Sequence, residues 1–175
     1  MDSQHQVIVA AGVTNEPVDR GQALAMVKGV KGNTGSHPEE VSADAGFFST
    51  RAVIGLKALG VEPFIPPDKT KHTVHLSPAP RGRIPKALSV VERMRRKLRT
   101  RRGKKRYALR METVEPVLGQ IKQGRGFRQS LLRGLNKVRG EWRLICTGHN
   151  LLKLFAALWE PRLLGQGVVA EGMAP

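Results

Sequence analysis

The chain lacks several features that would place it in familiar protein classes. It has one cysteine, Cys146, so no internal disulfide can form, and a lone cysteine on an apolar helix face is expected to pack in a core. No apolar run approaches the roughly 18 residues that a membrane-spanning helix needs. The first residues, MDSQHQ, do not resemble a signal peptide. These absences argue against a disulfide-stabilised secreted domain and a membrane-spanning chain, and they predict a cytoplasmic protein.

Acidic residues are also scarce, and the charge is unevenly placed. The 175 residues include 30 lysines and arginines against 14 aspartates and glutamates, which gives a net charge of +16. Residues 1–75 are nearly neutral, whereas residues 76–110 hold 14 basic residues and one acid. The excess positive charge is therefore concentrated in one stretch, whose centre is RMRRKLRTRRGKKRYALR (93–110).

Three interpretations of this basic run are open. It is a solvated helix face or tail, it binds a membrane surface, or it binds nucleic acid. Membrane binding needs a wide apolar face, and the run offers only scattered apolar residues. With almost no acid among the basic residues, self-repulsion makes the run costly unless a polyanion lies nearby. The sequence therefore favours nucleic acid as the partner.

Strand and helix patterns alternate in the N-terminal third of the chain. Apolar, β-branched residues predict strands over 6–14, 40–45 and 61–66. Between them, apolar residues at helical spacing predict two helices. This order predicts a layered α/β domain with mixed or parallel strand pairing.

Capping residues bound the two predicted helices. Asp19 is the expected N-cap of the first helix. Ser49 is the expected N-cap of the second, over 50–59, and Gly60 is expected to end it. These residues give the helices definite ends before any tertiary contact is considered.

The second half of the chain is predicted to be helical. Residues 67–86 are rich in proline and are expected to form a mobile loop or insertion, and helix is expected from about Ala87 onward. The tail 165–175 is expected to be flexible. Apolar residues recur at steps of three and four and predict a buried stripe: Leu131, Leu135, Val138, Trp142, Ile145, Leu152 and Trp159.

Asp44 is the acidic residue whose position most needs an explanation. It lies in SADAGFFS (42–49), at the carboxyl end of a strand predicted to be internal, where α/β domains present reactive groups. Burying a carboxylate costs several kcal/mol unless it is paired or bound to a metal. Two alternatives stay open from the local sequence: Asp44 caps the following helix or pairs with a lysine, or it serves a chemical site.

Glu115 is the second candidate, in YALRMETVEPVLGQIK (107–122). Seven residues separate it from Lys122, close to two helical turns, so both are expected on one face. A metal-binding carboxylate and a phosphate-binding ammonium would then line one groove, although an ordinary exposed face has the same composition. Pro116 disfavours helix at Glu115, so a helix either starts or kinks there.

Five segments carry a resemblance to a known family. They are QVIVAAGVTN (6–15), ADAGFFS (43–49), the Tyr-Ala-Leu-Arg…Glu…Lys arrangement of 107–122, GRGFRQSLLRG (124–134) and EWRLICTGHNLLKL (141–154). In this order over most of the chain, they resemble the DDE-type transposases of bacterial insertion sequences. That branch has a ribonuclease-H-like catalytic domain.

The resemblance implies roles for individual residues. Asp44 and Glu115 would be the second aspartate and the glutamate of the catalytic triad, and both would bind divalent metal. Tyr107, Arg110 and Lys122 would complete the signature as DNA-binding residues, and Arg110 and Lys122 would hold DNA phosphates. The cofactor would be Mg²⁺ or Mn²⁺ in a two-metal site that cleaves and joins DNA strands. The basic run would add further DNA contacts from Arg95, Arg96, Arg99, Arg101, Arg102, Lys104, Lys105 and Arg106.

The triad's first aspartate has no counterpart in this sequence. It should precede a segment like QVIVAAGVTN, and Asp2 lies outside any apolar strand, so Asp2 is not assigned that role. The sequence is therefore expected to be the C-terminal part of a truncated transposase with impaired cleavage. The expected divisions are an incomplete ribonuclease-H-like α/β core (1–66), a loop (67–86), a basic and helical remainder (87–164) and a tail (165–175).

The expected partners are DNA and either full-length transposase or a second copy of the chain, in the bacterial nucleoid and not at a membrane. Two other functions stay open. The chain is a non-catalytic basic nucleic-acid-binding protein, or it inhibits a full-length transposase by pairing with it. A binding protein has no need of acids at both Asp44 and Glu115, so the metal affinity of those residues separates the first alternative from an enzyme.

Overall fold

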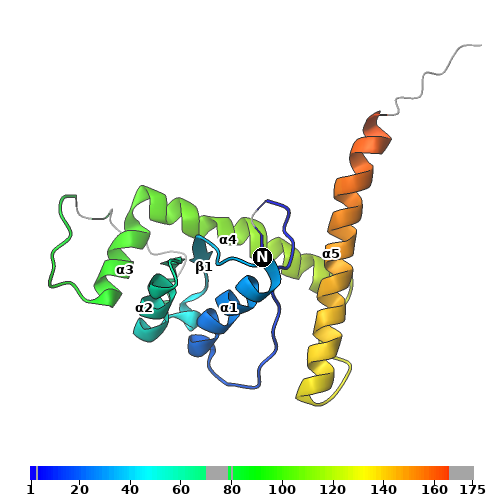
Figure 1. Cartoon of the computed structure of the whole chain (residues 1–175), viewed down its shortest axis with the longest axis horizontal. Helices are drawn as coiled ribbons and strands as arrows, with labels where there is room; N and C mark the ends of the chain where they lie inside the picture. Colours follow the sequence, from blue (N-terminus) through cyan, green and yellow to red (C-terminus); the bar gives the residue numbers. More distant parts are fainter. Residues whose placement is uncertain (3, 70–78, 80, 166–175) are drawn as a thin grey trace, which may run out of the picture.

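A computed structural model describes residues 1–2, 4–69, 79 and 81–165, with side chains described as far as residue 158. The described chain is a mixed α/β structure, mostly helical, with a small parallel sheet. Figure 1 shows α4 running along one side, with α1, α2, α3 and the sheet packed beneath it and α5 standing across its far end. The predicted mixture of strands and helices is thus confirmed at the coarse level.

The first half of the described chain contains two helices and two short strands. Their bounds are η1 Asp19–Gly21, α1 Gln22–Thr34, β1 Glu40–Ser42, η2 Ala45–Phe47, α2 Thr50–Ala58 and β2 Glu62–Phe64. Strands β1 and β2 pair in parallel, with Val41 opposite Pro63. The prediction of parallel pairing is therefore confirmed for the second and third predicted strands.

Local signals place the ends of α2 as the sequence predicts. The Ser49 side chain accepts a hydrogen bond from the Ala52 backbone N–H, and Gly60 follows the helix with a left-handed φ of 76°. The prediction for α1 is less accurate. Asp19 lies in the 3-10 turn η1 and makes no side-chain cap, and α1 begins after it.

Three long helices fill the second half. Their bounds are α3 Val90–Arg99, α4 Arg101–Gly119 and α5 Leu135–Gly165, with a π-helical turn, η3, at Gln120–Gly124 after α4. Ser89 and Glu92 form a capping box that starts α3. Thr100 caps α4 by accepting from the Gly103 N–H. The second half is therefore mostly helical, as predicted, except that residues 125–134 between η3 and α5 are not helical.

Two apolar clusters hold these elements together. The first joins α1 and α2 to the sheet through Val27, Leu56 and Ile65. The second joins the end of α4 to α5 and includes Ile121 and Cys146. Cys146 is buried, as predicted for a packing residue, and burial raises the pKa of its thiol. The site described below lies between β1 and α4.

The predicted strand over residues 6–14 is wrong. These residues have no strand pairing, because the described sheet contains only β1 and β2, and Gln6 at their start has a left-handed φ of 58°. Side chains replace the missing strand partner. The Asn150 side chain accepts from the Ile8 N–H (2.8 Å) and donates to the Ile8 carbonyl (2.9 Å), while Asn33 donates to the Val9 carbonyl (2.8 Å). The residues of this segment suggested a strand, but they did not reveal that its hydrogen-bond partners would be side chains.

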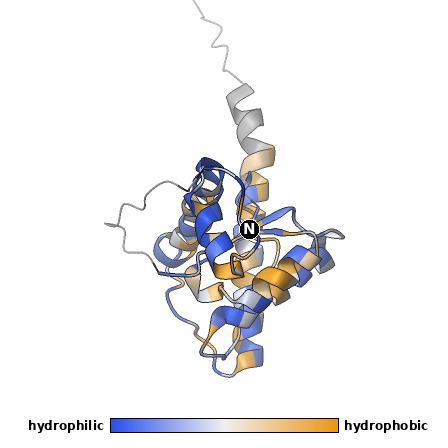
Figure 2. Cartoon of the chain, turned by 90° about the vertical axis from the view of Figure 1, so that its left-hand side faces the viewer, coloured by the Kyte–Doolittle hydropathy of each residue, from blue (hydrophilic) through white to orange (hydrophobic). Residues whose placement is uncertain are grey.

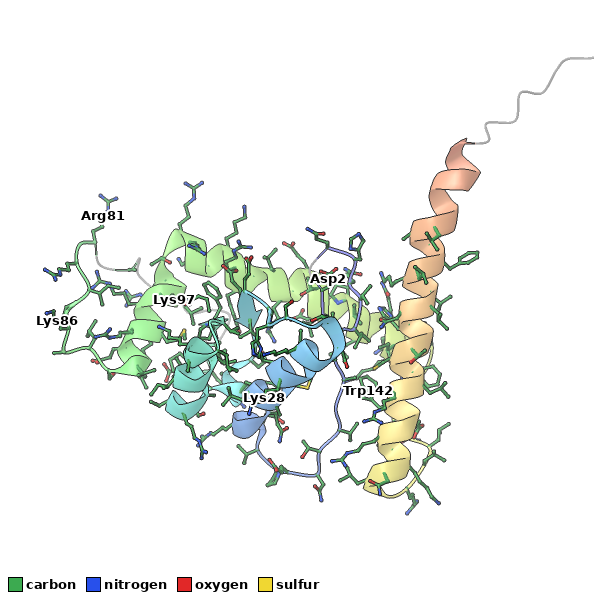
Figure 3. The ribbon with its side chains drawn as sticks, in the orientation of Figure 1. Asp2, Lys28, Arg81, Lys86, Lys97 and Trp142 are labelled. Atoms are coloured by element: carbon green, nitrogen blue, oxygen red, sulfur yellow. The ribbon has the colours of Figure 1, made fainter. Side chains whose placement is uncertain are left out.

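The predicted apolar stripe is only partly buried. Trp142 and Ile145 pack against the second cluster, and Figure 3 shows Trp142 on the side of α5 that faces the rest of the chain. Leu131 and Leu152, in contrast, are 76% and 53% exposed, so their assignment to the core is wrong. Leu131 lies in the non-helical segment before α5, and Leu152 lies on α5, which projects beyond the body that it packs against (Figure 1). The side chain of Trp159 lies outside the described side chains.

The predicted four-part division of the chain stays a prediction. Parts of the loop over 67–86 (70–78 and 80) and all but the first residue of the tail 165–175 lie outside the described residues. Within the part of the chain that the structure describes, no helix is long and apolar enough to cross a membrane.

Candidate functional site

Asp44 lies just beyond β1 on the side that faces α4. The Ala43 N–H extends the strand ladder to the Phe64 carbonyl, and Asp44 keeps an extended backbone before η2 begins. Its carbonyl accepts from the Phe47 N–H, but its side chain caps nothing and is 57% exposed. The capping alternative for this residue is therefore wrong, and the carboxylate is directed to other partners.

The Arg110 side chain brings the two candidate carboxylates together. Its Nη1 forms an ion pair with Asp44 Oδ1, and its Nη2 lies 3.7 Å from Glu115 Oε1. Arg110 and Asp44 are separated by 66 positions in sequence. The guanidinium side chain is 19% exposed, whereas both carboxylates are more than half exposed. Asp44 and Glu115 thus share one cation across β1 and α4.

The ring of Tyr107 lies beside the Arg110 guanidinium. The Arg110 guanidinium carbon lies 5.4 Å from the centre of the Tyr107 ring, at cation–π range. Burial raises the pKa of the Tyr107 hydroxyl above its ordinary value, Arg110 lowers it in part, and the negative charges of Asp44 and Glu115 raise it further. Tyr107 therefore stays a neutral phenol beside the charged groups.

Arg110 is incompletely satisfied where it lies. Its Nε is buried and has no hydrogen-bond partner among the described residues. On its other side is a cavity of about 420 Å³, which Arg106, Leu109, Ser42 and Asp2 also line. Asp2 does not join the carboxylate pair, since its Oδ2 accepts from the backbone of residues 4 and 5.

Lys122 does not share in this arrangement. Helix α4 passes through Glu115 and Pro116 without ending, so of the two alternatives for this position a helix start is ruled out. The π turn η3 then intervenes before Lys122. The widened π turn breaks the regular 3.6-residue spacing on which a common face was predicted. Among the described residues, no hydrogen bond or ion pair joins Lys122 to Glu115. Its DNA-binding role stays a prediction.

The proline inside α4 is compensated from the N-terminal segment. Pro116 has no N–H, so the Glu112 carbonyl four residues earlier has no helical donor. The Gln6 side-chain amide donates to that carbonyl at 2.9 Å. The loss of one helical hydrogen bond therefore creates an attachment point for residues 6–13.

Acidic residues from the sheet region pair with several members of the basic run. Asp68 forms two hydrogen bonds with Arg95 (2.6 and 2.9 Å), and Glu40 pairs with Arg102 and Arg106 at 3.0 Å. Arg96 donates to the Gly82 carbonyl. Sequence inspection missed these partners, because each lies tens of residues from its arginine. Only the scarcity of acidic residues within the run indicated that acidic partners would come from other parts of the chain.

The side chains of three exposed cations of the run have no hydrogen bond or ion pair within the described part of the chain: Arg101, Lys104 and Lys105. They occupy the first turns of α4. In Figure 2, which faces the α3 end of the molecule, hydrophilic residues colour much of the helices nearest the viewer. Arg81 and Lys86 extend from the segment before α3 at this same end (Figure 3). Exposed cations therefore come from two neighbouring parts of the chain, the first turns of α4 and the segment before α3.

The donor set at Asp44 and Glu115 suits one hard divalent cation. Mg²⁺ binds oxygen ligands, usually one or two carboxylates with waters and phosphate oxygens completing the octahedron. Both carboxylates are exposed enough to admit such ligands. No group of three or more histidine, cysteine or acidic residues that could hold a metal occurs among the described residues. The described site therefore offers two protein ligands, not three.

Comparison with known proteins gives one match. Residues 69–155, about half of the chain, match a family model described as a transposase DDE domain. The matched range contains Tyr107, Arg110, Glu115 and Lys122, whereas Asp44 lies before it. No curated protein and no solved structure matches.

Proposed function

Because the chain belongs to the transposase DDE domain family, we propose that it binds DNA and holds a divalent cation for strand cleavage and transfer. Asp44 and Glu115 are the proposed metal ligands and the catalytic carboxylates. The observation that carries this proposal is their meeting at one guanidinium, although they come from separate elements. The parallel order β1, α2, β2 supports a ribonuclease-H-like arrangement of the domain.

Each part of the site has a proposed task. Mg²⁺ or Mn²⁺, when bound, would polarise a phosphate oxygen and lower the pKa of a water ligand. The exposed cations at the start of α4 hold the DNA backbone, since lysine and arginine bind phosphates without reading sequence. Lys122 and Arg110 are proposed as further phosphate ligands. Cleavage by the chain alone is proposed to be slow, because the described site supplies two carboxylates where the resemblance implies three.

A DNA-binding experiment tests the proposal. Duplex affinity is measured with and without Mn²⁺, at constant ionic strength, for the wild type and for the double variant Asp44→Asn, Glu115→Gln. Without metal, the double variant should bind DNA more tightly because two repulsive charges are gone. With Mn²⁺, the wild type should gain about tenfold, or 1.4 kcal/mol, and the double variant should not.

A matched variant controls for the loss of negative charge. Glu16→Gln and Glu39→Gln together remove two acids that lie away from the site, and this variant should keep the wild-type response to Mn²⁺. Equal responses of the wild type and the Asp44–Glu115 variant would instead support a non-catalytic DNA-binding protein. Partnership with a full-length transposase and a place in the nucleoid follow as proposals from the DNA-binding role.

A further inference from the structure

Arg110 occupies the position that a metal ion would need between the two carboxylates. One guanidinium nitrogen pairs with Asp44 and the other faces Glu115 at 3.7 Å. We propose that Arg110 is an internal counter-cation of this pair, which divalent metal displaces and which a DNA phosphate helps to draw away. This inference rests on the proposed function of Asp44 and Glu115 and adds a device that couples metal binding to DNA binding.

Electrostatics explains why a counter-cation is needed. Two carboxylates that approach one another repel, and a nearby positive charge offsets that repulsion. Arg110 provides the charge without any ligand, so the metal-free chain keeps both acids in place. The same contact makes Arg110 a competitor of the metal ion, because a metal ion and a guanidinium that are bound to the same two carboxylates repel each other.

The surroundings of Arg110 favour its movement. Its buried Nε lacks a partner among the described residues, so the present position leaves one of its donors unused. The cavity of about 420 Å³ beside it gives the side chain space to turn. A phosphate oxygen pair suits the planar fork of a guanidinium better than a single carboxylate oxygen does. DNA that reaches the site would therefore favour the displaced position.

A different role for Arg110 predicts the opposite result. If Arg110 only holds the two carboxylates in place for the metal, its removal should weaken metal binding. If it competes with the metal, its removal should strengthen metal binding in the absence of DNA. The sign of the change in Mn²⁺ affinity separates the two roles.

The experiment is a calorimetric titration of the full chain with Mn²⁺, without DNA, for the wild type and Arg110→Gln. The expected result is tighter binding by Arg110→Gln, by at least about fivefold, the lower end of typical coupling between interacting sites. Arg128→Gln is the matched control. It removes one positive charge at an exposed residue that bonds Gln123, and its Mn²⁺ affinity should stay within about twofold of the wild type.

Addition of a short duplex gives the second readout. The wild-type affinity for Mn²⁺ should rise when DNA is present, because a DNA phosphate pairs with Arg110 and draws it away from the carboxylates. This rise should be lost in Arg110→Gln. Circular dichroism checks that the variant is folded. Should Arg110→Gln not fold, Arg110→Met replaces it: methionine keeps an unbranched side chain but carries no charge, so Mn²⁺ affinity should again exceed that of the wild type.

The outcomes distinguish this inference from the proposed function. Unchanged or weaker Mn²⁺ binding by the Arg110 variant, with binding still dependent on Asp44 and Glu115, overturns the counter-cation role alone. Mn²⁺ binding that is unchanged by Asp44→Asn and Glu115→Gln, whether Arg110 is present or replaced, overturns the proposed function and the counter-cation role together.

Discussion

At the scale of single residues, Asn150 takes the place of a neighbouring strand. Its side-chain amide satisfies both the N–H and the carbonyl of Ile8. Asn150→Leu should leave both groups unpaired and destabilise the fold by about 2–4 kcal/mol, since each unsatisfied buried group costs about 1–3 kcal/mol. Urea unfolding measures this loss. Asn136→Leu, the same change at an exposed position of α5, should shift stability by no more than about 0.5 kcal/mol.

His149 makes stability depend on pH. It is fully buried, and burial lowers the pKa of its imidazole, with Arg125 and Lys153 lowering it further against the opposing hydrogen bond to the Gln6 carbonyl. The unfolded chain therefore binds a proton more readily than the folded chain. Stability should be full above pH 6.5 and fall on acidification, by at most about 1.4 kcal/mol per pH unit.

The measurement is the unfolding midpoint in urea between pH 7.5 and pH 5. His149→Gln should flatten this dependence because the titrating group is gone. His5→Gln is the comparison, since His5 is exposed on the N-terminal turn, and it should leave the dependence in place. Equal slopes for the wild type and His149→Gln would contradict the assignment.

Gly103 is required where α3 turns into α4. A Cβ at this position would collide with the Lys97 carbonyl oxygen, which belongs to the backbone and cannot rotate away. Gly103→Ala should therefore cost about 1–3 kcal/mol as an overpacking change. Gly140→Ala, inside α5 with open space around it, should instead stabilise by up to about 1 kcal/mol through helix propensity. Thermal unfolding of the two variants compares them.

At the scale of elements, charge in the basic helices divides into paired and exposed cations. Arg95, Arg102 and Arg106 are held by acids from the sheet region, while Arg101, Lys104 and Lys105 have no such partner in the described chain. Replacing Arg101, Lys104 and Lys105 together by glutamine should lower the salt dependence of DNA binding. The slope of log K against log salt should fall by about 0.9 for each phosphate that the variant no longer neutralises.

The control for this prediction is the paired set. Asp68 already neutralises Arg95 through a bidentate contact, so Arg95→Gln should change the salt slope less than any single change at Lys104 or Lys105. Filter binding over a range of salt concentrations gives all slopes. A larger effect from Arg95 would mean that the ion pairs open when DNA binds.

Local signals made α2 predictable, and long-range contacts made the site unpredictable. Ser49 and Gly60 bound α2 through groups within a few residues, so the sequence alone reveals its ends. In contrast, the pairing of residues 6–14 depends on Asn150, more than a hundred positions away. The sequence predicts that this segment is extended but cannot identify its partner.

The same distinction applies to the candidate site. A carboxylate at the end of a strand indicated Asp44, the spacing to Lys122 indicated Glu115, and the resemblance implied roles for both. None of these signals placed Arg110 between them, because that contact spans 66 positions and depends on how α4 crosses β1. The buried stripe failed for a similar reason: helical spacing identifies an apolar face, but only the packing of α5 decides which part of that face is covered.

At the scale of the whole molecule, the two halves of the chain meet at one place. The nearly neutral N-terminal half provides Asp44 beside β1, and the basic half provides α4 with Glu115 and Arg110. Exposed cations at the start of α4, Arg101, Lys104 and Lys105, lie on the helix that also carries Arg110 and Glu115. Under the proposed function, this arrangement would let a strongly basic chain hold a metal ion and a polyanion side by side, with each offsetting the charge of the other.

Cleavage of the polypeptide by bound iron tests this junction most directly. Fe²⁺ that replaces Mg²⁺ at the site produces hydroxyl radicals with ascorbate and peroxide, and these break the chain nearest the metal. Breaks should appear near residues 44 and 115 together, and Asp44→Asn or Glu115→Gln should each abolish both, while Asp68→Asn should leave them unchanged. Breaks near 44 that persist in Glu115→Gln, or breaks confined to other parts of the chain, would contradict a shared cation site.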